Sequence, residues 1–395
     1  MSTLKNWGSE MPVERARKSV GSKISRQLWM RSGGRCEYCN KLLYRDSLTE
    51  RFMNKAYISH IVAAKEGFVR GDSKLSEELE VAFDNLMLLC DECHNRIDKA
   101  DPARHPVEVL QKIKKTHEDR IELLTAIKPK NKSHILTFMA KIGEHLPVID
   151  YQDAANTMLT DYYPASHRMV ELGIENYPKE DDQNEYWQVL ESTLTENFQT
   201  KVFPLLKSGE VNHFSVFGLA PQPLLIRLGV LLSDIKHVRV HTNIREPQTW
   251  KHPEDEDPLD FVIIEPEDKT GVPVLNISIT ADINESRIQS VLEEHASIWK
   301  LTVPTPGKDL VRSDATLQNF RKRVREIFER IKKAHGEDET LRVFPAMPNS
   351  TAIEFGRVWQ PKAELPMIIF DQNRSRDGFI KTVSIIKPKR TQYES

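Results

Sequence analysis

The sequence predicts two domains, a small α+β domain built around cysteine pairs and a larger α/β domain after it. All four cysteines of the 395-residue chain lie in two C-x-x-C pairs, Cys36/Cys39 and Cys90/Cys93. From His213 onwards, short apolar segments typical of strands alternate with segments of helical periodicity. The chain is also longer than the ~250–300 residues at which a single hydrophobic core stops growing.

The cysteine pairs indicate a structural zinc site. Each C-x-x-C turn supplies two thiolates, and four thiolates suit tetrahedral Zn²⁺. We therefore predict Cys36, Cys39, Cys90 and Cys93 as the zinc ligands. Reduced cysteines and an N-terminus without an apolar leader predict a cytoplasmic protein. No apolar run approaches the ~20 residues of a membrane span, so no membrane association is expected.

The charge of the chain is unevenly distributed. Residues 1–133 carry 25 Lys+Arg against 19 Asp+Glu, and the remaining residues carry 31 against 39. A basic first third and an acidic remainder favour a nucleic-acid-handling domain joined to a domain of another kind. A chance fluctuation of solvated surface charge is the alternative.

Local patterns predict the elements of the first domain. We expect a short helix over 25–31, a strand within 52–62 that ends near His60, and an apolar strand over 86–89. A helix should begin at His94, with Asp98 one turn later on the same face. Apolar residues recur at helical spacing over 106–124, which predicts an amphipathic helix.

The polar, basic run from Lys128 to Ser133 is predicted to be a linker, followed by a helical region over 133–206. Two later segments, Phe217 to Gly229 and Phe344 to Gly356, each combine a strand, a Pro-containing turn and a helix with a glycine. This likeness suggests an internal duplication. The remaining expected strands are 237–242, 261–264, 274–280, 298–303 and 367–371, and the remaining expected helices are 286–294 and 314–334.

The order of the cysteine pairs, His60, Asn85, His94 and Asp98 resembles the HNH nucleases, whose fold is the ββα-metal finger. The resemblance covers roughly residues 33–120. It implies that His60 is the general base and that Asn85 ties the loop that orients this base. It also implies that His94 binds a catalytic Mg²⁺ or similar ion. Asp98 is predicted to orient the imidazole of His94 from outside the coordination shell.

One position departs from the family pattern. Many HNH nucleases carry an aspartate immediately before the first histidine, where it binds the catalytic metal, and here that residue is Ser59. A hydroxyl is a poorer ligand for a hard cation than a carboxylate. The ion is therefore expected to rely either on His94, water and the substrate phosphate, or on a carboxylate that the sequence pattern does not locate.

Short apolar and proline-containing segments in the second domain, 217–224 and 344–348, together with Trp250 and Gly356-Arg357, resemble the SAVED domain. This domain consists of two fused Rossmann-like (CARF-like) halves that sense cyclic oligonucleotides in bacterial anti-phage signalling. An HNH domain followed by SAVED resembles the nuclease effectors of CBASS defence systems. The resemblance implies an endonuclease that degrades double-stranded DNA once a cyclic dinucleotide, such as a cyclic GMP-AMP isomer, binds. It also implies a homo-oligomer that grows from dimer to tetramer on activation.

Eight residues are candidate contacts to that cyclic dinucleotide. Helix N-termini after strands present free N–H groups to phosphates, arginines neutralise phosphates, and tryptophans stack on bases. The alternative for each tryptophan is a place in the hydrophobic core. The candidates are Pro221, Arg245, Trp250, Asn349, Ser350, Arg357, Trp359 and Arg374.

These inferences assign residues 1–127 to the HNH domain, 128–165 to a linker and connecting helix, and 166–395 to the SAVED domain. Two other functions stay open. One is a restriction-type HNH endonuclease whose C-terminal domain recognises DNA. The other is a zinc-stabilised DNA-binding regulator with a degenerate catalytic site, which Ser59 favours.

Overall fold

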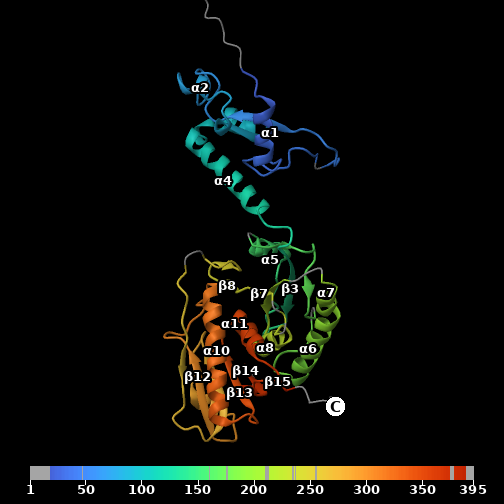
Figure 1. Ribbon diagram of the computed structural model, residues 1–395, viewed down its shortest axis with the longest axis vertical. Helices are drawn as coiled ribbons and strands as arrows, with labels where there is room; N and C mark the ends of the chain where they lie inside the picture. Colours follow the sequence, from blue (N-terminus) through green and yellow to red (C-terminus); the bar gives the residue numbers. More distant parts are fainter. Residues whose placement is uncertain are drawn as a thin grey trace, which may run out of the picture. The chain divides into compact units, whose positions relative to one another are not determined.

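The computed structural model describes residues 18–46, 48–159, 161–174, 177–209, 213–233, 235, 237–253, 256–373 and 378–387. The chain divides into two units, Met1–Lys128 and Pro129–Ser395 (Figure 1). We call them the first unit and the second unit and describe each by itself. The division falls at the first residue of the predicted linker.

The first unit is organised around two antiparallel strands and the helix that follows them. Strand β1 (Ala56–His60) pairs with β2 (Leu86–Cys90), and His60 lies opposite Leu86. Helix α3 (Asp91–Asn95) begins directly after β2 and continues as a π-helical turn, Arg96–Ala100. The order is therefore ββα. The unit also contains α1 (Ser22–Arg31), α2 (Leu75–Glu78) and α4 (Val107–Thr125).

The core of the first unit explains why the apolar run before the second cysteine pair does not alternate. All five residues of β2 are buried, because α1 and the first cysteine turn cover the faces of this short ribbon. Three of the four cysteines belong to the same buried cluster, which also contains Leu43, Ile97 and Leu110. The expected helices and strands of this unit are present, with ends that differ by a few residues.

The second unit contains two mainly parallel sheets, and its expected α/β class is confirmed. In the larger sheet the order is β10-β12-β11-β13-β14-β15, and only the edge strands β10 and β15 run antiparallel to their neighbours. These strands are Val262–Ile264 (β10), Val272–Ser278 (β11), Ala296–Thr302 (β12), Leu341–Ala346 (β13), Met367–Asn373 (β14) and Gly378–Ile385 (β15).

The smaller sheet has the order β4-β3-β6-β7, with β5 also beside β3. Its strands are Lys132–Met139 (β3), Tyr163–Pro164 (β4), Val170–Glu171 (β5), Phe214–Leu219 (β6) and Val238–Val240 (β7), and a separate hairpin joins Ile244–Arg245 (β8) to Gln248–Thr249 (β9). The helices of the unit are Tyr151–Met158 (α5), Asn184–Asn197 (α6), Phe203–Ser208 (α7), Gln222–Leu231 (α8), Glu285–Gln289 (α9), Asp314–His335 (α10) and Asn349–Val358 (α11). A π-helical turn, Phe198–Val202, joins α6 to α7.

Helices α8 and α11 lie side by side in the middle of the unit (Figure 1). Each follows a strand of a different sheet, β6 before α8 and β13 before α11. These are the two segments whose likeness suggested a duplication, and their helices share one hydrophobic core with both sheets.

The prediction of a linker and connecting helix over residues 128–165 is wrong for residues 132–139. This stretch is β3, which pairs in parallel with β6 over the whole length of that strand. Residues 135–138 are all buried, so the segment lacks the alternation that marks a half-exposed strand. Among the described residues of 128–165, only those of α5 are helical. Strand β15 was also not expected.

Candidate functional site

The four cysteines of the first unit form one cluster. Their Sγ atoms lie within 4.8 Å of one another, and Cys39 Sγ is 3.7 Å from Cys90 Sγ. The first turn is closed by hydrogen bonds from Asn40 N to Cys36 O and from Cys36 N to Lys41 O. The second turn joins the end of β2 to α3, so the cluster connects the first turn to the ββα unit.

The geometry of this cluster fits a zinc ion. Tetrahedral Zn²⁺ with Zn–S bonds of ~2.3 Å places its sulfur ligands ~3.8 Å apart. Burial raises the pKa of the Cys36 thiol to about 11, so a buried thiolate here requires a cation beside it. Four cysteines that lie this close together can therefore hold a metal ion such as zinc.

A pocket of about 560 Å³ in the first unit contains most of the predicted catalytic residues. His60 reaches it from the end of β1, and His94 and Asp98 reach it from the helical segment after the second cysteine pair. His94 is stacked on Tyr57 of β1, with ring centroids 5.1 Å apart. Residues 34 positions apart in sequence are thus brought to one cavity by the pairing of β1 with β2.

The hydrogen bond of His60 defines its tautomer. Nε2 lies 2.8 Å from the carbonyl oxygen of Glu80, and a carbonyl only accepts, so Nε2 carries the hydrogen. In the neutral imidazole the lone pair is then on Nδ1, the nitrogen suited to accept a proton.

Asn85 does not line the pocket but supports the loop after His60. Its Oδ1 accepts from Val62 N at 2.7 Å, and its Nδ2 donates to Val62 O at 2.9 Å and to Leu79 O at 3.1 Å. The side-chain amide of Asn85 is buried, and it supplies hydrogen-bond partners to the backbone N–H and C=O of Val62 in the loop after His60. Such contacts suit the positioning role predicted for Asn85.

Asp98 is placed to orient His94, as its carboxylate Oδ2 lies 3.4 Å from His94 Nε2. Ser59 also lines the pocket, is 2% exposed, and its Oγ has no hydrogen-bond partner among the described residues. The imidazole and the carboxylate are ligand types that divalent ions accept, and Mg²⁺ characteristically completes its shell with water and phosphate oxygens. His94 could therefore supply one protein ligand to such an ion, with Asp98 behind it orienting the imidazole.

Arg70 is the pocket residue that the sequence interpretation missed. Its guanidinium donates to Ile61 O at 2.9 Å, to Ile97 O at 2.8 Å and to the carboxylate of Asp98. The side chain is only 6% exposed. One arginine therefore joins the residue after His60 to the helix that carries His94. In the sequence it stands in a loop rich in Gly and charge, where an arginine looks like a solvated surface residue.

In the second unit, the two strand-to-helix turns meet. Asn349 Nδ2 donates to Gly218 O at 3.1 Å, and Met347 N donates to the side chain of Gln222 at 3.1 Å. Pro221 is the N-cap of α8, so three of the predicted ligand contacts, Pro221, Asn349 and Ser350, lie at two adjoining helix N-termini. Ser350 is itself buried and accepts from Thr242 Oγ1 at 2.9 Å.

The predicted stacking role of both tryptophans is wrong in this conformation. Trp359 is 2% exposed and donates from Nε1 to Leu365 O at 2.8 Å. Trp250 is also buried and packs edge-on against Phe217. Neither ring offers a face to a ligand, because an α/β core of this size uses its largest side chains for packing.

The three candidate arginines have different outcomes. Arg357 is committed within the protein, because its guanidinium pairs with the buried Glu354 at 2.9 Å. Arg245, in β8, is exposed and remains a candidate. Arg374 lies outside the described residues.

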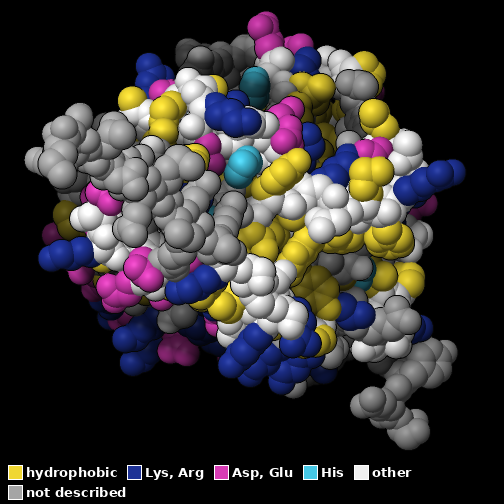
Figure 2. Space-filling model, turned by 90° about the horizontal axis from the view of Figure 1, so that it is seen from above, with side chains coloured by type: hydrophobic (Ala, Val, Ile, Leu, Met, Phe, Trp, Pro, Cys, Tyr) yellow, Lys and Arg dark blue, Asp and Glu magenta, His cyan; other side chains and the backbone are white. Residues whose placement is uncertain are grey.

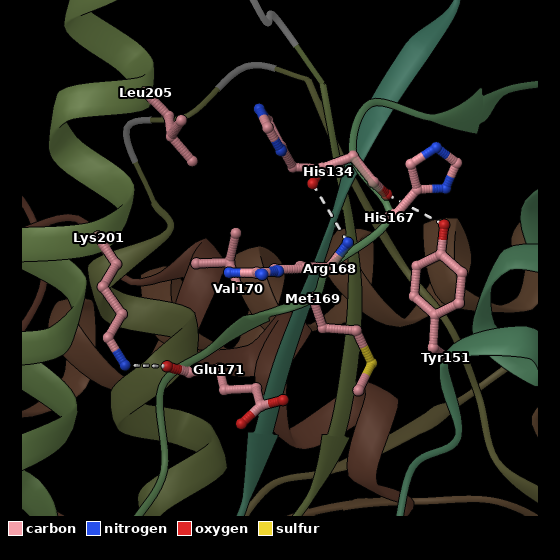
Figure 3. A pocket seen from close by; sticks show the side chains of 10 residues that line it. His134, Tyr151, His167, Arg168, Met169, Val170, Glu171, Lys201 and Leu205 are labelled. Carbon is pink, nitrogen blue, oxygen red and sulfur yellow. Dashed lines mark hydrogen bonds between the residues drawn. The ribbon is translucent and has the colours of Figure 1, made fainter.

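A further pocket, of about 700 Å³, lies at the start of β3 in the second unit (Figure 3). Arg168, Lys201 and two histidines line it together with Glu171, and Lys201 Nζ donates to Glu171 O at 2.8 Å. Within the described chain, none of the eight predicted ligand contacts lines this pocket. It is therefore separate from the paired helix N-termini of α8 and α11.

In the part of the chain that the structure describes, no helix is both long and apolar enough to cross a membrane. Comparison with curated proteins finds no match.

Residues 194–385, just under half of the chain, match the family model described as SMODS-associated and fused to various effectors sensor domain, or SAVED. This stretch is therefore a SAVED domain, as the short apolar segments predicted.

Among solved structures, the chain is similar to the Acinetobacter baumannii Cap4 SAVED/CARF-domain containing receptor with the cyclic trinucleotide 2'3'3'-cAAA. The two chains share 12% identity, the match covers 80% of this chain and 67% of that one, and the TM-score is 0.43. The Moraxella osloensis Cap4 SAVED/CARF-domain containing receptor matches with 11% identity, 80% and 66% coverage, and a TM-score of 0.40. The chain thus spans about two thirds of the length of these proteins.

Proposed function

We propose that the chain is an HNH-type DNA endonuclease whose activity is controlled by its SAVED sensor domain, as an effector of a CBASS anti-phage system. The observation that supports the nuclease is the shared pocket of His60, His94 and Asp98 on a ββα unit beside a four-cysteine cluster. The SAVED match over residues 194–385 supports the sensor.

In this proposal His60 removes a proton from the attacking water through Nδ1, while Glu80 O holds the Nε2 hydrogen. Asn85 keeps the loop after His60 in place. His94 would hold Mg²⁺ or a similar ion at the same pocket, and Asp98 would orient its imidazole. Such an ion supplies positive charge against the negative charge that develops on the phosphate. The cysteine cluster, with zinc, is the scaffold that places His94.

The activating ligand is proposed to be a cyclic dinucleotide, such as a cyclic GMP-AMP isomer, bound at the adjoining N-termini of α8 and α11. Helix N-termini attract phosphates through their free N–H groups and positive dipole ends. The α8 terminus follows β6 of the smaller sheet, and the α11 terminus follows β13 of the larger sheet. Because the two strand-to-helix turns are hydrogen-bonded to each other, one ligand there would contact both turns at once. Binding would then drive assembly from dimer to tetramer and release cleavage of double-stranded DNA.

One assay tests this function. Full-length protein is incubated with plasmid DNA and Mg²⁺, with and without a panel of cyclic dinucleotides and trinucleotides. The variants are His60→Ala and, as a matched control, His145→Ala, an exposed histidine of the second unit. We expect cleavage only with a cyclic nucleotide, its loss in His60→Ala, and normal cleavage by His145→Ala. Size-exclusion chromatography with and without the activating nucleotide should show the larger oligomer.

Each alternative predicts a different result in this assay. Cleavage that is the same with and without every cyclic nucleotide would contradict the sensor and favour a restriction-type nuclease. DNA binding without cleavage under any condition would favour the DNA-binding regulator. Cleavage by His60→Ala at the wild-type rate would show that His60 is not the base.

A further inference from the structure

The loop formed by residues 63–71, which we call the rim loop, lies between the end of β1 and α2 and lines the pocket of His60 and His94. Two apolar side chains on it are exposed at the pocket rim, Phe68 at 67% and Val69 at 42%. A phenyl ring that stays in water gains nothing from the hydrophobic effect until a partner covers it. An exposed aromatic ring at the rim of a candidate active site is therefore a candidate for contact with a bound molecule.

The rim loop is built to hold that ring in a defined place. Ala63 N donates to Arg70 O at 3.2 Å, and Gly71 N donates to Phe68 O at 2.8 Å. A Cβ at Gly71 would lie 2.3 Å from Glu66 O, so the loop closes too tightly for any side chain there. Arg70 then anchors the loop to the ββα unit through three acceptors.

The charges around Phe68 indicate what kind of partner fits. Lys65 and Lys99 line the same pocket, together with Arg70 and two histidines. Among the described residues that line it, Asp98 is the one with an acidic side chain. Cationic lining attracts a phosphate backbone. An aromatic side chain beside such a groove typically stacks on bases or enters a base step as an apolar wedge. On the face of the molecule drawn in Figure 2, hydrophobic side chains lie among lysines, arginines and acidic side chains.

We propose that Phe68, held at the pocket rim by the Arg70-anchored loop, is a substrate-contacting residue that stacks on or wedges between bases of duplex DNA next to the scissile phosphate. This inference rests on the proposed nuclease function and names a residue of its substrate site. Stacking of one aromatic ring on one base corresponds to roughly a tenfold or larger change in affinity.

The test compares full-length wild type with Phe68→Ala, Phe68→Trp and Phe52→Ala. Phe52 is a matched control, a phenylalanine of the first unit that is 84% exposed and does not line the pocket. Binding is measured by fluorescence anisotropy on a short DNA duplex containing 2-aminopurine, with the cyclic GMP-AMP isomers present and Ca²⁺ replacing Mg²⁺ to prevent cleavage. The 2-aminopurine fluorescence reports base unstacking. KM and kcat are measured separately with Mg²⁺.

For Phe68→Ala we expect Kd and KM to rise about tenfold, kcat to stay near wild type, and the 2-aminopurine signal to be lost. Phe68→Trp should retain binding and signal, and Phe52→Ala should resemble wild type. If Phe68→Ala behaves like Phe52→Ala in an active enzyme, the inference is wrong and the nuclease function stands. A change of oligomer size in Phe68→Ala, with unchanged DNA affinity, would show that the ring contacts another copy of the chain instead.

The DNA-binding measurement also distinguishes the two proposals if the wild-type protein does not cleave DNA. If wild type binds the duplex without cutting it, the nuclease function fails, and the Kd of Phe68→Ala still shows whether Phe68 contacts DNA. If wild type neither binds nor cuts DNA in any condition, both the function and this inference are overturned.

Discussion

Gly229 of α8 and Gly356 of α11 face each other at the point where the two helices cross. A Cβ on Gly229 would lie 2.0 Å from Ile353 O, and a Cβ on Gly356 would lie 2.0 Å from Ile226 O. Each glycine thus meets the carbonyl three residues before its counterpart, so the contact is reciprocal. This local two-fold relationship supports the internal duplication suggested by the two Gly-bearing segments.

Substitution of either glycine by alanine should destabilise the second unit. The added methyl group meets backbone, which cannot rotate away, and overpacking of this kind costs typically about 1–3 kcal/mol or more. Chemical denaturation should show this loss for Gly229→Ala and Gly356→Ala. Gly307→Ala is the control, because its Cβ would meet only Leu310 Cδ1 at 4.0 Å. Equal stabilities for all three variants would contradict the close helix crossing.

Loss of one cysteine should unfold the first unit selectively. A structural zinc ion contributes ~10–16 kcal/mol of binding free energy in small zinc domains, comparable to or above the ~5–15 kcal/mol stability of a domain. Cys93→Ser should therefore lose its zinc, measured by elemental mass spectrometry, and the unfolding transition of the first unit, measured by calorimetry. Lys41→Ala, beside the first turn, should keep one zinc per chain. A wild-type protein without bound metal would refute the zinc prediction.

Arg70→Lys should loosen the rim loop although the charge is kept. A lysine ammonium cannot reproduce the planar fork that reaches Ile61 O, Ile97 O and Asp98 together. Each lost hydrogen bond to a charged group costs ~1.5–3 kcal/mol. Hydrogen–deuterium exchange of residues 63–71 should become faster. Arg104→Lys, an exposed arginine paired with Asp101, should leave this exchange unchanged. Slow exchange in both variants would show that the backbone bonds alone hold the loop.

Asp371 should make the stability of the second unit depend on pH. Burial, with the charge of Asp181 nearby, raises the pKa of the Asp371 carboxyl from 3.8 to about 7. Because the folded pKa lies above the unfolded value, its stabilising contribution is present below about pH 4 and is lost as the pH rises through about 7.

The variant Asp371→Asn isolates this effect, since its side chain stays neutral at every pH. Between about pH 5 and about pH 8, the unfolding free energy of wild type should fall relative to that of Asp371→Asn. Other titrating groups, such as His213, whose pKa burial lowers to about 4, are common to both proteins and cancel in the difference. Parallel pH profiles would show that Asp371 is not protonated in the folded protein.

Trp359→Ala should act on stability rather than on ligand recognition. Truncation of a buried tryptophan costs ~3–5 kcal/mol through lost packing and the cavity left behind. Denaturant unfolding of the second unit should show this loss. Phe203→Ala, at a half-exposed phenylalanine of α7, should change stability little. A selective loss of cyclic-nucleotide affinity in a stably folded Trp359→Ala protein would restore the stacking role.

The sequence by itself determined the features that depend on neighbours within a few turns. C-x-x-C spacing specifies a ligand-bearing turn whatever surrounds it, so the cysteine cluster was predictable. Helical periodicity likewise predicted α10 with ends that differ by at most a residue, and prolines marked the starts of the helices in the two Gly-bearing segments, α8 and α11. Short apolar-proline segments were sufficient to predict a SAVED domain, expected over residues 166–395 and matched by the family model over residues 194–385.

Only the tertiary structure decided what depends on strand pairing and burial. His60 and His94 meet because β1 and β2 pair in one register, and no local pattern measures that distance. Strand β3 was missed because a strand buried on both faces has no alternation. In the sequence Arg70 resembles a solvated surface arginine, but in the fold its guanidinium donates to three acceptors. Trp359 likewise resembles a ligand contact in the sequence, but it lies in the hydrophobic core. Spacing along the chain constrains residues a few positions apart, whereas long-range contacts arise only when the sheets and helices pack together.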